Sequence, residues 1–81
     1  MIVIEKETKK KREDIINIAK SYFGPEGEGL ETTREEDCCV SFEGGGGHVS
    51  VRYIDTDTGK SKVEVESREF EHQAKQFLGK V

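Results

Sequence analysis

The stretch from Cys38 to Tyr53 constrains the fold more than any other part of this sequence. It consists of two alternating runs, CCVSFE and HVSVRY, on either side of four consecutive glycines. Because successive side chains of a strand point to opposite faces, each run has one apolar and one polar face. The pattern predicts a β-hairpin whose turn lies within the glycines.

The alternation also predicts the register of this hairpin. If Gly44 pairs with Gly47 around a two-residue turn, Phe42 lies opposite Val49, and apolar residues face apolar residues along both strands. The other predicted pairs are Val40 with Val51, Cys38 with Tyr53 and Glu43 with His48. A shift by one residue would lose this match, so the register is well specified.

Four glycines exceed what a two-residue turn needs, since only its central residues adopt positive φ. Two explanations stay open for the outer pair, Gly44 and Gly47. Either they let another backbone pass close to the hairpin, from the GPEGEG loop at residues 24–29 or from a partner chain, or the tip is a wide loop without a role.

The first part of the chain predicts a strand and then a helix. Residues 1–4 are largely β-branched and favour a strand. Thr8 is a candidate N-cap for the helix, and Gly24-Pro25 is a strong stop signal. Between them, apolar residues recur at helical spacing: Ile15, Ile16, Ala19, Tyr22 and Phe23.

The second part predicts one weak strand, one further hairpin and a final helix. Residues 30–34 are the weak strand, with Leu30 opposite Phe42 if residues 35–37 form the turn. Asp57-Thr58-Gly59 fits a three-residue hairpin loop that places Tyr53 opposite Val63. Ser67 is the candidate N-cap of the final helix, whose apolar face contains Phe70, Ala74, Phe77, Leu78 and Val81.

The predicted fold is therefore a single α+β domain over residues 1–81. It has one antiparallel sheet of four to five strands, in the order β-α-β-β-β-(β)-α, with both helices packed on one face. This order of elements resembles a shortened helix-grip layout, in which a C-terminal helix lies on a curved antiparallel sheet. The core residues expected to be deeply buried and in mutual contact are Phe42, Val51, Val65, Phe70 and Phe77.

Charge and hydropathy argue against several classes of protein. The chain has 81 residues, 37% of them charged, and a net charge of −4, which disfavours binding to nucleic acid or to an anionic membrane. No apolar run reaches the length of a transmembrane helix. At the start, apolar residues precede the basic ones, the reverse of a signal peptide. We therefore expect a cytoplasmic protein.

The two cysteines, Cys38 and Cys39, are adjacent. On one strand they would point to opposite faces, which disfavours a disulfide between them. We expect both to be reduced, with Cys38 buried and inert. Cys39 should be exposed beside Arg52 and should react first with a thiol reagent.

Two functions from different classes fit these patterns. The first is a non-catalytic binding or assembly module, with itself or another protein as partner, acting through an edge strand or the polar sheet face. The residues of that face that we single out as a partner surface are Cys39, Ser41, Glu43, His48, Ser50 and Arg52. The alternative is a carrier of small apolar ligands. Its cleft between helix and sheet would be lined by Phe42, Tyr53, Phe70 and Phe77.

Catalysis is the weaker interpretation. His48 lies opposite Glu43 and next to Ser50 in the predicted register, and these are the residue types of a nucleophilic triad. An open sheet face lacks the water-excluding cleft that such chemistry needs. The spacing of the cysteines and histidines matches no zinc site, and the glycines lead into a strand rather than a helix, unlike a phosphate loop. We expect no metal, no cofactor and no enzymatic activity.

Overall fold

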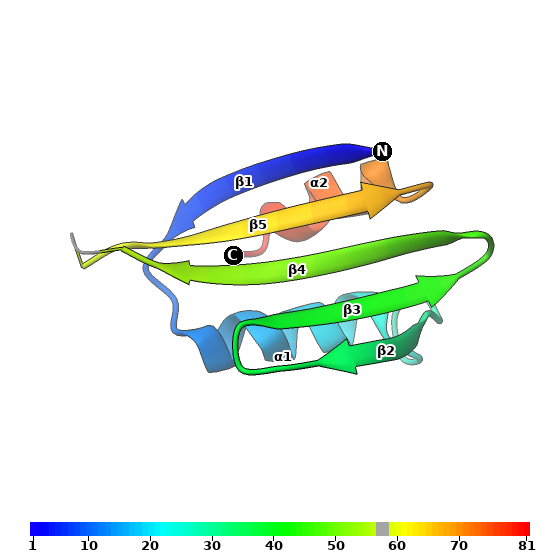
Figure 1. Ribbon diagram of the computed structural model, residues 1–81, viewed down its shortest axis with the longest axis horizontal. Coiled ribbons are helices and arrows are strands. Elements are labelled where there is room, and N and C mark those ends of the chain that lie inside the picture. The colour runs from blue at the N-terminus through cyan, green and yellow to red at the C-terminus, as the bar shows by residue number, and fades with distance from the viewer. Residues whose placement is uncertain (57–58) are drawn as a thin grey trace.

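A computed structural model describes residues 1–56 and 59–81 of this chain. The chain forms five strands and two helices (Figure 1). In chain order they are β1 (Ile2–Thr8), α1 (Arg12–Phe23), β2 (Glu31–Glu35), β3 (Cys39–Gly44), β4 (Gly47–Asp55), β5 (Ser61–Arg68) and α2 (Glu71–Leu78). The α+β class and the order of elements predicted from the sequence are confirmed.

The five strands form one antiparallel sheet in the spatial order β1-β5-β4-β3-β2. Strands β2 to β5 follow one another as a meander. Strand β1 lies at the opposite edge of the sheet from β2 and pairs with β5 (Figure 1). Strands β1 and β2 are therefore the two edges of the sheet. The molecule is elongated, with extents of 38 × 20 × 18 Å.

The predicted hairpin registers are confirmed. Phe42 pairs with Val49, and Gly44 pairs with Gly47. The central turn residues have φ values of 58° at Gly45 and 85° at Gly46, as a primed turn requires. The second hairpin has the expected pairs, Tyr53 with Val63 and Arg52 with Glu64. Of its predicted turn, residues 57–58 lie outside the described residues, and Gly59 has the expected positive φ of 79°.

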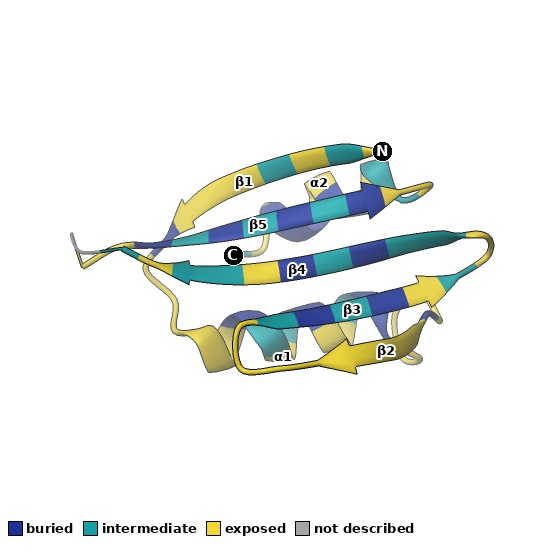
Figure 2. Cartoon of the chain, in the orientation of Figure 1, coloured by how far each residue is buried: buried dark blue, intermediate teal, exposed yellow. Residues whose placement is uncertain are grey.

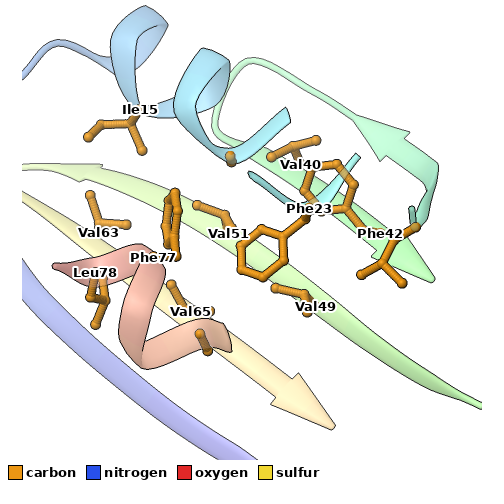
Figure 3. Packing of buried hydrophobic residues seen from close by; sticks show 13 residues of the cluster. Ile15, Phe23, Val40, Phe42, Val49, Val51, Val63, Val65, Phe77 and Leu78 are labelled. Atoms are coloured by element: carbon orange, nitrogen blue, oxygen red, sulfur yellow. The ribbon is translucent and has the colours of Figure 1, made fainter. Parts of the chain in front are cut away.

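The core fills the space between the helices and one face of the sheet (Figure 3). The ring of Phe23 from α1 lies at its centre, 5.7 Å from the ring of Phe42 in β3 and 5.3 Å from that of Phe77 in α2, measured between centroids. Dark blue residues alternate along β3, β4 and β5 in Figure 2, as expected for strands with one covered face. The buried apolar residues are Ile15, Ala19, Phe23, Leu30, Val40, Phe42, Val49, Val51, Val63, Val65, Ala74, Phe77 and Leu78.

The predicted start of the first helix is wrong. Thr8 is the last residue of β1, and its Oγ1 accepts a hydrogen bond from the Lys10 amide at 3.1 Å. Helix α1 begins after Lys11, which supplies no side-chain cap. The predicted end is confirmed, since the helix stops at Phe23 and Gly24 follows. Pairing of β1 with β5 extends to Thr8, which places this threonine in the sheet rather than at a helix terminus.

The predicted edge strand exists with a different register. Strand β2 covers Glu31–Glu35, and Thr32, not Leu30, lies opposite Phe42. Leu30 precedes the strand and is buried in the core. Glu36 and Cys39 exchange backbone hydrogen bonds of 2.7 and 3.2 Å, so the turn residues are Asp37 and Cys38 rather than residues 35–37. The register of β2 against β3 shifts at a bulge between Thr32 and Arg34.

The predicted start of the final helix is also wrong, because Ser67 belongs to β5. It lies on the core face, paired with Val49 on one side and Ile2 on the other, and is fully buried. Helix α2 begins at Glu71, with Phe70 at the N-cap. Phe70 itself is only half-buried, which corrects its predicted place in the deep core.

Substitution of Ser67 by alanine should test this placement by its sign. Within residues 1–56 and 59–81, the Ser67 hydroxyl is buried without a hydrogen-bond partner. Removing an unpaired buried hydroxyl relieves a desolvation cost, so we expect the free energy of unfolding in urea to stay unchanged or rise by up to about 1 kcal/mol. An N-cap serine would behave in the opposite way and lose about 1 kcal/mol.

Candidate binding surface on the open sheet face

The face of the sheet that points away from both helices is the first candidate surface. Figures 1 and 2 show it from the front, with the helices behind the strands. Among the described residues, no helix or strand covers it. Polar and charged side chains from all five strands occupy this face, so it differs clearly from the apolar face that contacts the helices.

The structure brings the six predicted partner-surface residues together on this face. They form three cross-strand pairs between β3 and β4: Cys39 with Arg52, Ser41 with Ser50, and Glu43 with His48. The two serine hydroxyls lie 3.0 Å apart and share a hydrogen bond. The pairs follow from the central hairpin register, which the sequence predicts well.

The serine pair bears on the triad interpretation. Ser50 uses its hydroxyl in the bond to Ser41, and within the part of the chain that the structure describes no hydrogen bond joins His48 to either serine. A triad needs a histidine that accepts the proton of the nucleophile. The arrangement therefore gives no geometric support to hydrolysis.

A shallow hollow of about 200 Å³ lies in the middle of this face. It is lined by the short side chains of Cys39, Ser41 and Ser50 together with longer residues. The longer residues are Arg34, Glu36, Val51, Arg52, Glu64 and Glu66. Arg34 Nε donates to Glu36 Oε1 at 2.9 Å, an exposed ion pair of small energetic weight.

The two cysteines are joined by a disulfide, which corrects the prediction that both are reduced. The prediction failed because strand β3 begins at Cys39, so Cys38 lies in the turn, where strand alternation does not fix its side chain. Cys38 is exposed rather than buried, although its carbonyl accepts the Tyr53 amide at 2.8 Å as in the predicted pairing. The expected preference of a thiol reagent for Cys39 no longer applies.

The four aromatic residues of the predicted ligand cleft do not line one space. Phe42 and Phe77 are fully buried, and both pack around Phe23. Phe70 lies beside the glycine turn at one end of β4. Tyr53 lies towards the other end, where its hydroxyl contacts the Ser61 hydroxyl at 2.6 Å.

Strand β1 provides a second candidate surface, which the sequence alone did not single out. Val3 lies on this edge strand, and Met1 directly precedes the strand. Both are large apolar residues, and Met1 is 73% and Val3 60% exposed. Alternation in IVIE indicates that Val3 faces away from Ile2 and Ile4. It does not indicate that the strand lies at an edge, because that depends on the order of strands in the sheet.

Comparisons with known proteins assign no family. No family model, no curated protein and no solved structure matches this chain. In the described ranges 1–56 and 59–81, no helix is long and apolar enough to cross a membrane. The same residues contain no group of three or more histidine, cysteine or acidic side chains arranged to hold a metal ion.

Proposed function

We propose that this protein is a non-catalytic assembly module in which β1 pairs with the β1 strand of a second copy. The observation that carries the proposal is the difference between the two edges of the sheet. Backbone N–H and C=O groups along an open, regular edge are ready to pair with another strand. One edge here has that form, and the other does not.

Strand β1 is long and regular. All seven residues from Ile2 to Thr8 pair with β5 in one continuous register. Strand β2, at the opposite edge, has five residues and a bulge between Thr32 and Arg34. Bulges are a common means by which proteins protect an edge from further pairing. The contrast favours β1 as the edge that accepts a partner.

One feature of β1, the charged residue Lys6 on its inner face, would ordinarily protect an edge. Here the Lys6 ammonium group donates to the Leu78 carbonyl at 3.0 Å, at the C-terminal end of α2. A cation at that position interacts favourably with the helix dipole. Lys6 therefore serves the packing of α2, and its presence does not argue against pairing.

A two-fold axis at Ile4 gives the most favourable pairing of two copies. Opposite residues must lie on the same face of the extended sheet, and in this register Ile4 faces Ile4 of the second copy while Val3 faces Glu5. A two-fold axis at Glu5 would instead place two glutamates directly opposite each other, which is unfavourable. The proposed dimer thus has one continuous ten-stranded sheet.

Sedimentation equilibrium on the purified chain tests the proposal. We expect a dimer for the parent protein and a monomer for Val3→Glu, because the new carboxylate would face Glu5 of the second copy. Val3→Lys should stay dimeric, since a lysine at this position would face that same glutamate. Thr33→Glu is the matched control, an exposed residue on the other edge, and should not change the mass.

The outcomes separate the alternatives. A parent protein that is monomeric at all concentrations, or a dimer that Val3→Glu leaves intact while Thr33→Glu dissociates it, would overturn the β1 interface.

The cytoplasmic location stays a prediction. In that compartment disulfides are usually transient and take part in redox reactions rather than supporting a fold.

A further inference from the structure

The disulfide between Cys38 and Cys39 does not act as a structural staple. A disulfide stabilises a fold mainly by closing a loop in the unfolded chain, and its effect grows with the length of that loop. These cysteines are adjacent in sequence, so the bond encloses no intervening residue. The two backbone bonds between Glu36 and Cys39 already close the same turn. The bond therefore calls for a chemical explanation.

Both sulfur atoms belong to residues at the surface. Cys38 is exposed in the turn between β2 and β3, and half-buried Cys39 lines the hollow in the open sheet face. Exposed disulfides are the ones that exchange with thiols, whereas structural disulfides are protected. Cys38 is the more exposed of the two residues, so we expect an incoming thiolate to reach its sulfur first.

Arginines line the same hollow as Cys39. Arg52 is its direct cross-strand partner, and Arg34 lines the same hollow from β2. Acidic residues are present too: Glu36 is paired with Arg34 at 2.9 Å, and Glu64 lies opposite Arg52 on β5, with Glu66 further along that strand. A guanidinium group beside a cysteine stabilises the thiolate form, which is what a leaving sulfur becomes.

From these observations we infer that Cys38 and Cys39 form a thiol–disulfide exchange site whose substrates are small or protein dithiols. A thiolate of the dithiol attacks Sγ of Cys38, a new S–S bond forms, and the Cys38–Cys39 bond breaks. Its electron pair goes to Cys39 Sγ, which leaves as a thiolate beside Arg52.

The second step completes a balanced two-electron transfer. The remaining thiolate of the dithiol attacks its own sulfur in the mixed disulfide and releases Cys38 as a thiolate. Two protons from the dithiol, exchanged through water, convert the cysteines to thiols. The dithiol is oxidised to a disulfide, and the cysteine pair is reduced. The site lies between β2 and β3, away from the proposed β1 interface, so the two proposals stand or fall separately.

Reduction of the folded, oxidised protein by dithiothreitol tests this inference. We expect the mass to rise by two hydrogens under native conditions, and N-ethylmaleimide should then label both cysteines while circular dichroism stays that of the folded protein. With the monothiol glutathione, fragmentation mass spectrometry should place the mixed disulfide on Cys38. Resistance to reduction until urea unfolds the chain would overturn the site.

The role of Arg52 is tested with a matched pair of variants. Arg52→Gln should slow reduction about threefold or more, because the leaving thiolate loses its neighbouring cation. Arg68→Gln removes another exposed arginine, on β5 beside His48 rather than Cys39, and should leave the rate unchanged. Equal rates for both variants, or a mixed disulfide confined to Cys39, would contradict the proposed direction of attack.

Discussion

Replacement of Phe77 by alanine is expected to lower the free energy of unfolding by about 3–5 kcal/mol. Phe77 is fully buried, and its ring lies 5.3 Å from that of Phe23, so truncation leaves a cavity between α2, α1 and the sheet. A domain of this size has a total stability of about 4–12 kcal/mol, and the loss would remove a large part of it. Urea unfolding followed by circular dichroism measures the change.

Phe70→Ala is the matched control for this prediction. Phe70 lies at the N-cap of the same helix but is only half-buried. Its truncation removes less apolar surface from contact and should cost clearly less than that of Phe77. Equal losses at the two positions would show that α2 does not dock through Phe77.

The second large effect is expected at Gly47. An alanine Cβ there would overlap the Arg68 carbonyl oxygen and would lie 2.6 Å from Glu69 Cβ and 2.9 Å from Phe70 Cε2. Backbone atoms cannot rotate away as a side chain can, so either β4 or the connection from β5 to α2 must move. We expect Gly47→Ala to cost about 3 kcal/mol in urea unfolding.

Gly44→Ala should be much milder, although Gly44 is the direct partner of Gly47. Its Cβ would meet Leu30 Cδ2 at 2.8 Å, the flexible end of a side chain, and lies 3.7 Å from Leu30 Cα. If both variants lost the same stability, the asymmetry between backbone and side-chain neighbours would be wrong. If neither lost any, the glycines would be a plain connector.

The geometry behind these predictions explains why four glycines follow one another. Gly45 and Gly46 adopt positive φ in the turn, whereas Gly47 gives room to a backbone of this same chain. Glu69, at φ 73°, turns the chain back over Gly47 between β5 and α2. The neighbour predicted from the sequence was the GPEGEG loop or a partner chain. Leu30, which follows that loop, is the neighbour of Gly44 alone.

Sequence patterns predicted the parts of the fold that depend on how neighbouring strands pair with each other. The hairpin from Cys39 to Asp55 follows from alternation, because a shift by one residue would place valines opposite polar residues. Ser67 shows where local preference misleads. Serine favours helix N-caps, but pairing of β5 with both β1 and β4 continues to Ser67 and outweighs that preference.

Some features of the candidate sites could likewise be predicted from the sequence, and others could not. The pairing of Ser41 with Ser50 and of Cys39 with Arg52 could be derived from the register alone. The disulfide could not, because it depends on whether the strand begins at Cys38 or one residue later. The β1 edge could not either, since alternation fixes the face that a side chain occupies but not the neighbours of its strand.

The position of β1 beside β5 has a consequence for the order of events during folding. Ile4 pairs with Val65, so β1 can pair only after the chain as far as β5 has been synthesised. Contacts between residues far apart in sequence form slowly, because a long loop must close first. On the ribosome, the apolar start of β1 therefore stays unpaired while the rest of the sheet is synthesised; it contains Ile2, Val3 and Ile4. Unpaired strand edges and exposed apolar residues favour aggregation during such an interval.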